Sequence, residues 1–288
     1  MSKISIITSF AGLWLTSYLS DKNQIIFGFI LIFTFGILHG ANDLVLINQM
    51  NSKKEHPFLK IISTYIVVVL FSVILFTSFP SFALLLFIIV SGYHFGEQHW
   101  QSITTERSIT SKLFELIYGL FILDLLLYLN NVAVSKVIFK ITNQQITPYT
   151  YSTSLIVIGL LLVVFTYLMA KKSNDFKKII LEQLFYLVLL GVIFKSSSLI
   201  WGFTIYFIFW HSIPSLNDQI IFLYGKYSFS NLKKYIKTAF LYWFISLCGI
   251  TILFYMAKDL LVFDALFFSF LASITFPHAI VILKMFKK

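Results

Sequence analysis

The chain has 288 residues, of which 58% are hydrophobic and 12% charged, and its mean hydropathy is +0.87. These values lie far outside the averages of soluble globular chains, so they exclude a water-soluble enzyme and predict a membrane protein. The formal net charge of +10 then has to be explained within a membrane.

Apolar segments of about 17 to 25 residues, the length that a transmembrane helix needs, follow one another along the whole chain. In chain order, we expect ten membrane-spanning helices at residues 4–20, 24–48, 58–79, 81–100, 110–129, 153–171, 177–195, 199–216, 236–257 and 260–283. The first segment lacks the small-x-small cleavage site of a secretory signal, so we interpret it as a retained helix. The longest loops, about 130–152 and 217–235, are too short to fold alone. The sequence therefore predicts an all-α helical bundle that forms a single transmembrane domain over residues 1–288.

The positive charges are distributed unevenly over the two sides of this predicted bundle. If all ten segments cross the membrane, both termini and the loops after the even-numbered segments share one side, which carries 17 of the 22 Lys and Arg residues. The other side carries Lys22, Lys136, Lys140, Lys195 and Lys258. This bias places both termini in the cytoplasm under the positive-inside rule. The basic charge is thus a topology signal, and no nucleic-acid partner is expected.

Four of the six histidines lie in even-numbered segments, all of which run from the outside to the inside in this topology: His39, His94, His211 and His278. His56 lies in a polar loop. Each of the four sits past the middle of its segment, towards the cytoplasmic end. A single intramembrane histidine more often hydrogen-bonds a neighbouring helix than binds a ligand. All four histidines, however, share the same depth and the same helix direction. This agreement predicts that they converge in one layer of the membrane.

Small and helix-breaking residues accompany these histidines. Glycines four residues apart flank two of them, with Gly36 and Gly40 around His39 and Gly92 and Gly96 around His94. This spacing lets helix backbones approach closely. Pro214 follows His211, and Pro277 directly precedes His278. Because proline removes a backbone donor and tends to kink a helix, both positions can open room for a ligand.

Neutral imidazoles are ligands for iron, copper or zinc. Four of them on one Fe(2+) would leave two octahedral positions, where O2 could bind beside an apolar substrate. Asp43 lies four residues after His39 on the same helical face, and Glu97 lies three residues after His94. Because carboxylates commonly hold the second ring nitrogen of a metal-bound histidine, we predict both as supporting groups.

Other polar and aromatic residues lie near the same layer. His99 is about 140° around the helix from His94, so we expect it to be a supporting or interfacial group. Trp100 beside it is predicted to be a membrane-interface anchor. Aromatic residues that could line a tunnel for a long hydrophobic ligand are Tyr93, Phe95, Tyr206 and Trp210. Acidic residues within apolar segments are Glu115, Asp124, Glu182 and Asp264, of which Glu182 could be a further supporting group.

Four segments, taken in order, resemble the membrane-bound β-carotene 15,15'-dioxygenases of the bacteriorhodopsin-related-protein (Brp/Blh) family. They are HGANDL at 39–44, YHFGEQHW at 93–100, WHSIPSL at 210–216 and FPHAIVI at 276–282. The resemblance implies a multi-pass protein of the bacterial inner membrane that uses Fe(2+) and O2. Its substrate would be β-carotene, cleaved at the central double bond into two retinal molecules, often to supply a microbial rhodopsin.

The resemblance also implies particular iron ligands. His39, His94 and His211 match family histidines that are considered ligands. The family commonly has a further histidine four residues after that of the WHS segment, where this chain has Ser215. His278 or His99 could complete the site, or three histidines and water could hold the metal, or the activity could differ. We predict His278, because it shares the layer of the other three.

Three other classes of membrane protein use intramembrane histidines. Di-iron desaturases need HxxxH and HxxHH clusters, and the sequence has neither. A b-type haem protein clamps haem between two histidines of facing helices, usually in both leaflets. A proton- or ion-coupled transporter distributes polar groups along a path through the membrane, which Asp124 and Asp264 could complete.

Overall fold

The structure is a computed structural model that describes residues 3–50, 58–101, 103, 108–256 and 260–286. Within these ranges all regular elements are helical, which confirms the predicted all-α class. His56 and its predicted loop lie outside the described residues, as does the side chain of Asp264.

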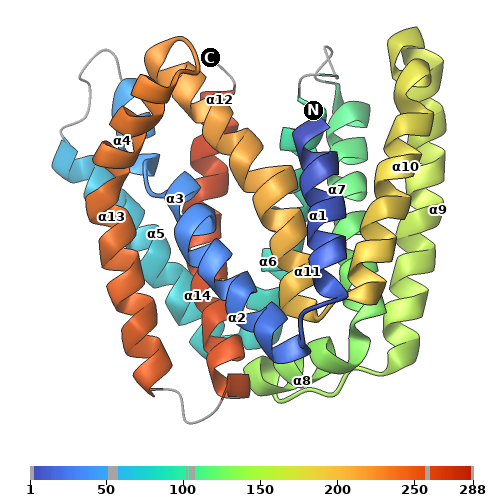
Figure 1. Cartoon of the computed structure of the whole chain (residues 1–288), viewed down its shortest axis with the longest axis horizontal. Helices are drawn as coiled ribbons and strands as arrows, with labels where there is room; N and C mark the ends of the chain where they lie inside the picture. The colour runs from blue at the N-terminus through green and yellow to red at the C-terminus, as the bar shows by residue number, and fades with distance from the viewer. Residues whose placement is uncertain (1–2, 51–57, 102, 104–107, 257–259, 287–288) are drawn as a thin grey trace. The chain divides into compact units, whose positions relative to one another are not determined.

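Each of the ten predicted segments overlaps a helix of the structure (Figure 1). In chain order the elements are α1 (Lys3–Thr16), α2 (Asp21–Leu31), the π-helix η1 (Ile32–Gly36), α3 (Ile37–Gly40), α4 (Asp43–Met50), α5 (Phe58–Ser78), α6 (Pro80–Trp100), α7 (Ile109–Leu129), α8 (Asn131–Thr142), α9 (Pro148–Lys172), α10 (Asn174–Ser196), α11 (Leu199–Ile205), the π-helix η2 (Tyr206–Ser212), α12 (Ile213–Tyr224), α13 (Phe229–Met256) and α14 (Leu260–Met285).

Seven of the described helical stretches are long and apolar enough to cross a membrane. They are Asp21–Met50, Pro80–Trp100, Pro148–Lys172, Asn174–Ser196, Leu199–Tyr224, Phe229–Ile252 and Leu266–Met285. Helices α7 and α8, which are bent by 100° relative to each other, would be an eighth candidate if they formed one span. Helix α1 and residues 62–78 of α5 are also apolar but shorter. These helices are compatible with a multi-pass membrane protein, and the count of ten spans stays a prediction.

The prediction of two long loops, at residues 130–152 and 217–235, is wrong, because helices occupy most of each range. Residues 131–142 form α8, in which Val134 and Val137 are buried while Lys136 and Lys140 are exposed. This amphipathic pattern is too short and too polar to be recognised as a span. Further along, α12 continues to Tyr224 and ends at Gly225, whose φ of 81° is a left-handed conformation that favours glycine.

The helices form two compact units that alternate along the chain. The first unit comprises residues 1–30, 88–136 and 145–211, and the second comprises residues 31–87, 137–144 and 212–288. That residues 1–288 form a single transmembrane domain stays a prediction.

In the first unit, α7 packs along α9, α10 packs against both, and α1 lies beside α10 and α11 (Figure 1). A close helix crossing in this unit is that between α6 and α7. A Cβ atom on Gly96 would lie 1.8 Å from the carbonyl oxygen of Glu115, and one on Gly119 would lie 1.9 Å from that of Gly92. Only glycine fits such a crossing, so the predicted close approach at Gly92 and Gly96 is confirmed, and it fixes the helix that carries His94.

Trp100 is packed inside the first unit, so its predicted role as an exposed interface anchor is wrong. The side chain is 1% exposed, and its ring lies 4.7 Å from that of Phe114 and 5.1 Å from that of Phe176, measured between centroids. These aromatic contacts bury the whole indole, which a position at the end of a helix does not reveal in the sequence.

In the second unit, α14 packs along α5 and against α4, while α12 and α13 pack against each other and against α3. The core beside α3 contains Ile220, Tyr235 and Ala239, which are fully buried, and Leu38 and Ala41 pack against it. The short helix α3, which carries His39, is therefore enclosed by α12 and α13.

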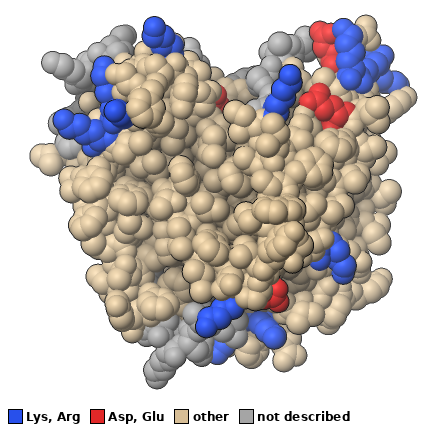
Figure 2. Space-filling model, in the orientation of Figure 1, with Lys and Arg blue, Asp and Glu red and all other residues tan. Residues whose placement is uncertain are grey.

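The outer faces of the helices are apolar. Along α9, Ile156, Leu160, Val163 and Tyr167 are exposed. On the face shown in Figure 2, charged side chains lie near the ends of helices, and uncharged ones cover the middle of each. Such an exposed apolar middle is expected where lipid, not water, surrounds the protein.

Candidate metal centre

Two of the four predicted ligands are carried by interrupted helices. The π-helix η1 ends three residues before His39, and the π-helix η2 contains His211. In η1 the backbone N–H of Ile37 bonds to the carbonyl of Ile32, five residues earlier rather than four. Short π-helical turns inside α-helices occur frequently at functional sites. Neither π-helix could be predicted from the sequence, because no residue pattern marks such turns.

His39 is buried, and its ring is oriented by its own helix. Nδ1 is hydrogen-bonded to the carbonyl oxygen of Gly36, the last residue of η1. Because a carbonyl oxygen only accepts, Nδ1 carries the proton of the neutral ring. The lone pair available to a metal is therefore on Nε2.

His278 is oriented by a carboxylate. Its Nδ1 donates to Asp43 Oδ1 over 2.8 Å, and the hydroxyl of Tyr65 donates to Asp43 Oδ2 over 3.0 Å. Asp43 was predicted to share a helical face with His39, but the helix breaks at Ala41 between α3 and α4. The carboxylate therefore supports His278 instead. Tyr65 was missed, since no local spacing connects α5 with Asp43.

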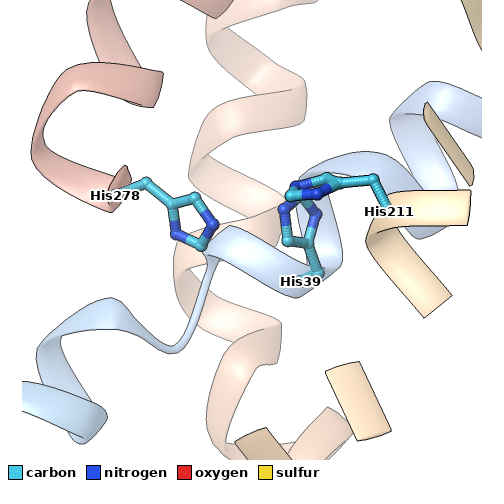
Figure 3. A group of neighbouring side chains, drawn as sticks. All are labelled: His39, His211 and His278. Carbon is cyan, nitrogen blue, oxygen red and sulfur yellow. The ribbon is translucent and has the colours of Figure 1, made fainter. Parts of the chain in front are cut away.

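Three of the four predicted ligands lie close together. The rings of His39 and His278 are 4.8 Å apart between centroids and nearly perpendicular. His211, the last residue of the first unit, is joined by a peptide bond to Ser212 of the second. One ligand nitrogen each of His39, His211 and His278 lies within 4.8 Å of the other two, all three residues are buried, and the side chains point towards one another (Figure 3).

This spacing is near what a single metal ion requires. Metal–imidazole bonds are about 2.1 Å long, so two nitrogen ligands of one ion lie at most about 4.2 Å apart. The nitrogen atoms of the three histidines, which lie within 4.8 Å of one another, come close to that distance. The donor set is thus suited to a transition metal such as iron, copper or zinc.

His94 lies beside His211 in the first unit. It is 1% exposed, and its ring centroid is 4.7 Å from that of His211. The ring of Phe95 packs 4.5 Å from that of His211 and 5.6 Å from that of Tyr206. Phe207 stacks on His211 at 5.6 Å. A buried aromatic wall therefore adjoins the two histidines.

The other two aromatic residues predicted to line a tunnel lie differently. The indole N–H of Trp210 donates to Ser9 Oγ on α1 over 2.8 Å, and its ring stacks with that of His99 at 6.4 Å. Tyr93 is half-buried on α6. Trp210 thus contributes to the packing of α1 and to the surroundings of His99.

His99 belongs to a separate polar cluster that joins α6, α7 and α10. Its Nε2 lies 2.6 Å from Gln183 Oε1, and the hydroxyl of Tyr118 donates to the same oxygen over 3.1 Å. Since the amide oxygen accepts, His99 Nε2 carries a proton and is engaged there. Glu182, the predicted supporting acid on α10, accepts a hydrogen bond from the hydroxyl of Tyr186.

Ser215 lies in a buried hydrogen-bonded chain of the second unit. Its hydroxyl accepts from Gln219 Nε2 over 3.2 Å, and the hydroxyl of Tyr235 lies 2.7 Å from Gln219 Oε1. All three residues are fully buried. The remaining acidic residues of the prediction, Glu97, Glu115 and Asp124, are also buried inside the first unit.

A family model described as beta-carotene 15,15'-dioxygenase matches residues 30–286 of the chain. This range contains His39, His94, His211 and His278, together with Asp43 and Tyr65. Comparisons with curated proteins and with solved structures gave no match.

Proposed function

Because the chain belongs to the β-carotene 15,15'-dioxygenase family, we propose that it cleaves β-carotene with O2 at the central double bond, giving two molecules of all-trans-retinal. The observation that carries this proposal is the group of three buried imidazoles, His39, His211 and His278, within 4.8 Å of one another. Polar side chains within a membrane protein are costly unless they find partners or serve a function. A shared metal ion would give all three a purpose.

We propose Fe(2+) as the metal, held by four histidines: His39, His94 and His211, with His278 as the fourth ligand. Bound iron would supply the redox chemistry that makes O2 reactive towards a carbon–carbon double bond. The protein prepares its ligands: Gly36 holds the proton of His39 on Nδ1, and Asp43 does the same for His278. Both rings therefore offer Nε2, and Asp43 fixes the orientation of the His278 ring.

The aromatic wall beside His211 fits a carotenoid. Phe95 and Phe207 contact the ring of His211, and Tyr206 contacts Phe95. Flat, buried rings can pack against a long conjugated hydrocarbon and keep water away from it. These residues would hold the centre of the polyene next to the histidines.

The topology proposed with this function has ten membrane spans and both termini in the cytoplasm of a bacterial cell. It is supported by the positive-inside distribution of the Lys and Arg residues and by the apolar outer faces of the helices. A carotenoid dissolved in the bilayer could then reach the site from lipid. A microbial rhodopsin would be a natural acceptor for the retinal.

Expression in cells that make β-carotene tests the function. We expect the cells to lose their orange colour and to accumulate retinal, measured by chromatography of extracted pigments. Unchanged carotene in cells that contain the folded protein would refute the proposal. A haem absorption band in the purified protein would instead favour the b-type haem alternative.

Asp43→Asn is expected to weaken metal binding by about 10- to 100-fold, the range typical of groups that support a ligand. Asparagine keeps the shape of the side chain but removes the negative charge that His278 faces and one of the two accepting oxygens. Competition with a chelator of known affinity measures the effect. The matched control is Asp175→Asn at an exposed ion pair with Lys178. Equal affinities of Asp43→Asn and the wild type would exclude a supporting role.

A pair of variants identifies the fourth ligand. His278→Ala is expected to remove most bound iron, and Ser215→His is expected not to restore it. Position 215 is fully buried and hydrogen-bonded to Gln219, so an imidazole there would be crowded. Iron content per folded protein is the measurement. Full iron content in His278→Ala would show that His278 is not the fourth ligand. Recovery of iron when Ser215→His is added to His278→Ala would show that a histidine at position 215 can take that place.

A further inference from the structure

The direction of His39 depends on a one-residue insertion in its helix. In the π-helix η1, Ile37 N–H bonds to the carbonyl of Ile32, whereas in an α-helix it would bond to that of Phe33. A π-turn adds one residue to the helical turn, and each residue corresponds to about 100° of rotation. Residues that follow the turn, His39 among them, therefore point in a direction set by where the turn lies.

The carbonyl of Phe33 has a donor from another helix. Trp243 on α13 donates its indole N–H to this oxygen over 2.8 Å. Within a membrane every backbone carbonyl has to be satisfied by the protein, so a donor at this point stabilises the π-turn where it is. Trp243 thus donates to the carbonyl of Phe33, while the backbone N–H of Ile37 donates to that of Ile32.

The same helix also contacts the segment after the π-turn. The hydroxyl of Tyr235, two turns before Trp243 on α13, lies 3.1 Å from the carbonyl oxygen of His39. Asn42 Nδ2 donates to the carbonyl of Tyr235 over 3.0 Å. Thus α13, which packs against α3 (Figure 1), binds the chain before and after His39.

We propose that Trp243 is a positioning residue for His39 and acts through η1. Its hydrogen bond fixes the π-turn at Phe33, the π-turn fixes the carbonyl of Gly36, and that carbonyl accepts the proton of His39 Nδ1. The imidazole is thereby presented with Nε2 available. This inference rests on the proposed role of His39 as a metal ligand.

The test compares two identical substitutions. Trp243→Phe removes the indole N–H and keeps an aromatic ring at this half-buried position, whereas Trp14→Phe makes the same change at a residue that is 62% exposed. With Co(2+) as the probe, Trp243→Phe is expected to lower the affinity about 10-fold and to shift the visible Co(2+) bands. Amide hydrogen exchange over residues 32–40 is expected to become faster. Trp14→Phe is expected to change none of these.

Each outcome has one meaning. Co(2+) affinity, spectrum and exchange like those of the wild type in Trp243→Phe would overturn the positioning role. Faster exchange with unchanged affinity and spectrum would also overturn it, because Trp243 would then stabilise only the helix. A wild-type protein that binds no Co(2+) would overturn the proposed metal site itself. If Trp243→Phe does not fold, benzothienylalanine at position 243, which replaces only the N–H with sulfur, takes its place.

Discussion

His39→Ala is expected to abolish the formation of retinal in cells that make β-carotene. His39 is one of three buried histidines whose ligand nitrogens lie within 4.8 Å of one another. Removal of a ligand should lower the metal affinity by more than about 100-fold, since loss of a supporting group alone typically lowers it by 10- to 100-fold. Retinal by chromatography and iron per folded protein are the two measurements. His94→Ala is expected to give the same result, because its ring lies against that of His211.

The matched control for both variants is His56→Ala, in a segment that the sequence predicts to be a polar loop. It should retain both iron and activity. Wild-type retinal formation by folded His39→Ala would contradict the proposed ligand set. Loss of activity with full iron content would contradict the role of His39 as a ligand, while leaving a role in substrate binding.

Gly96→Ala is expected to prevent stable folding. The added Cβ atom would lie 1.8 Å from the backbone carbonyl oxygen of Glu115, and a backbone atom cannot move aside as a side chain can. Helices α6 and α7 would have to separate, at a cost of about 3 kcal/mol or more. Thermal unfolding in detergent and the yield of folded protein measure the effect.

Gly249→Ala is the control for this substitution, since among the described residues no atom beyond its own helix backbone and chain neighbours lies within 4 Å of the position that its Cβ would occupy. We expect its unfolding temperature to stay near that of the wild type. Gly96→Ala with an unchanged unfolding temperature would show that α6 and α7 do not cross as described. His94 lies between Gly92 and Gly96, so metal binding should be lost together with the crossing.

Features determined by local composition could be predicted from the sequence. The length of each apolar segment was enough to predict a helix, and every predicted segment overlaps one. The spacing of Gly92 and Gly96 correctly indicated a close helix crossing. His39, His211 and His278 stood out because a buried imidazole is conspicuous in an apolar segment. Their grouping in the structure agrees with the predicted convergence, while their role as iron ligands stays a proposal.

Features determined by contacts between distant segments could not be predicted. Asp43 supports His278 rather than its neighbour His39, because the helix breaks between α3 and α4. His99 is paired with Gln183, which lies 84 residues away in the chain. Phe33, in the π-helix before His39, accepts a hydrogen bond from Trp243, which lies 210 residues away. No local pattern contains such information, whereas hydrophobic periodicity is local.

The most direct test of the account uses the purified protein in lipid nanodiscs, loaded with Fe(2+) and supplied with β-carotene and O2. The expected result is two molecules of retinal for each β-carotene consumed, with formation that requires both iron and O2. Folded, iron-loaded protein that leaves β-carotene intact, or that forms retinal equally well after complete removal of the metal, would contradict it.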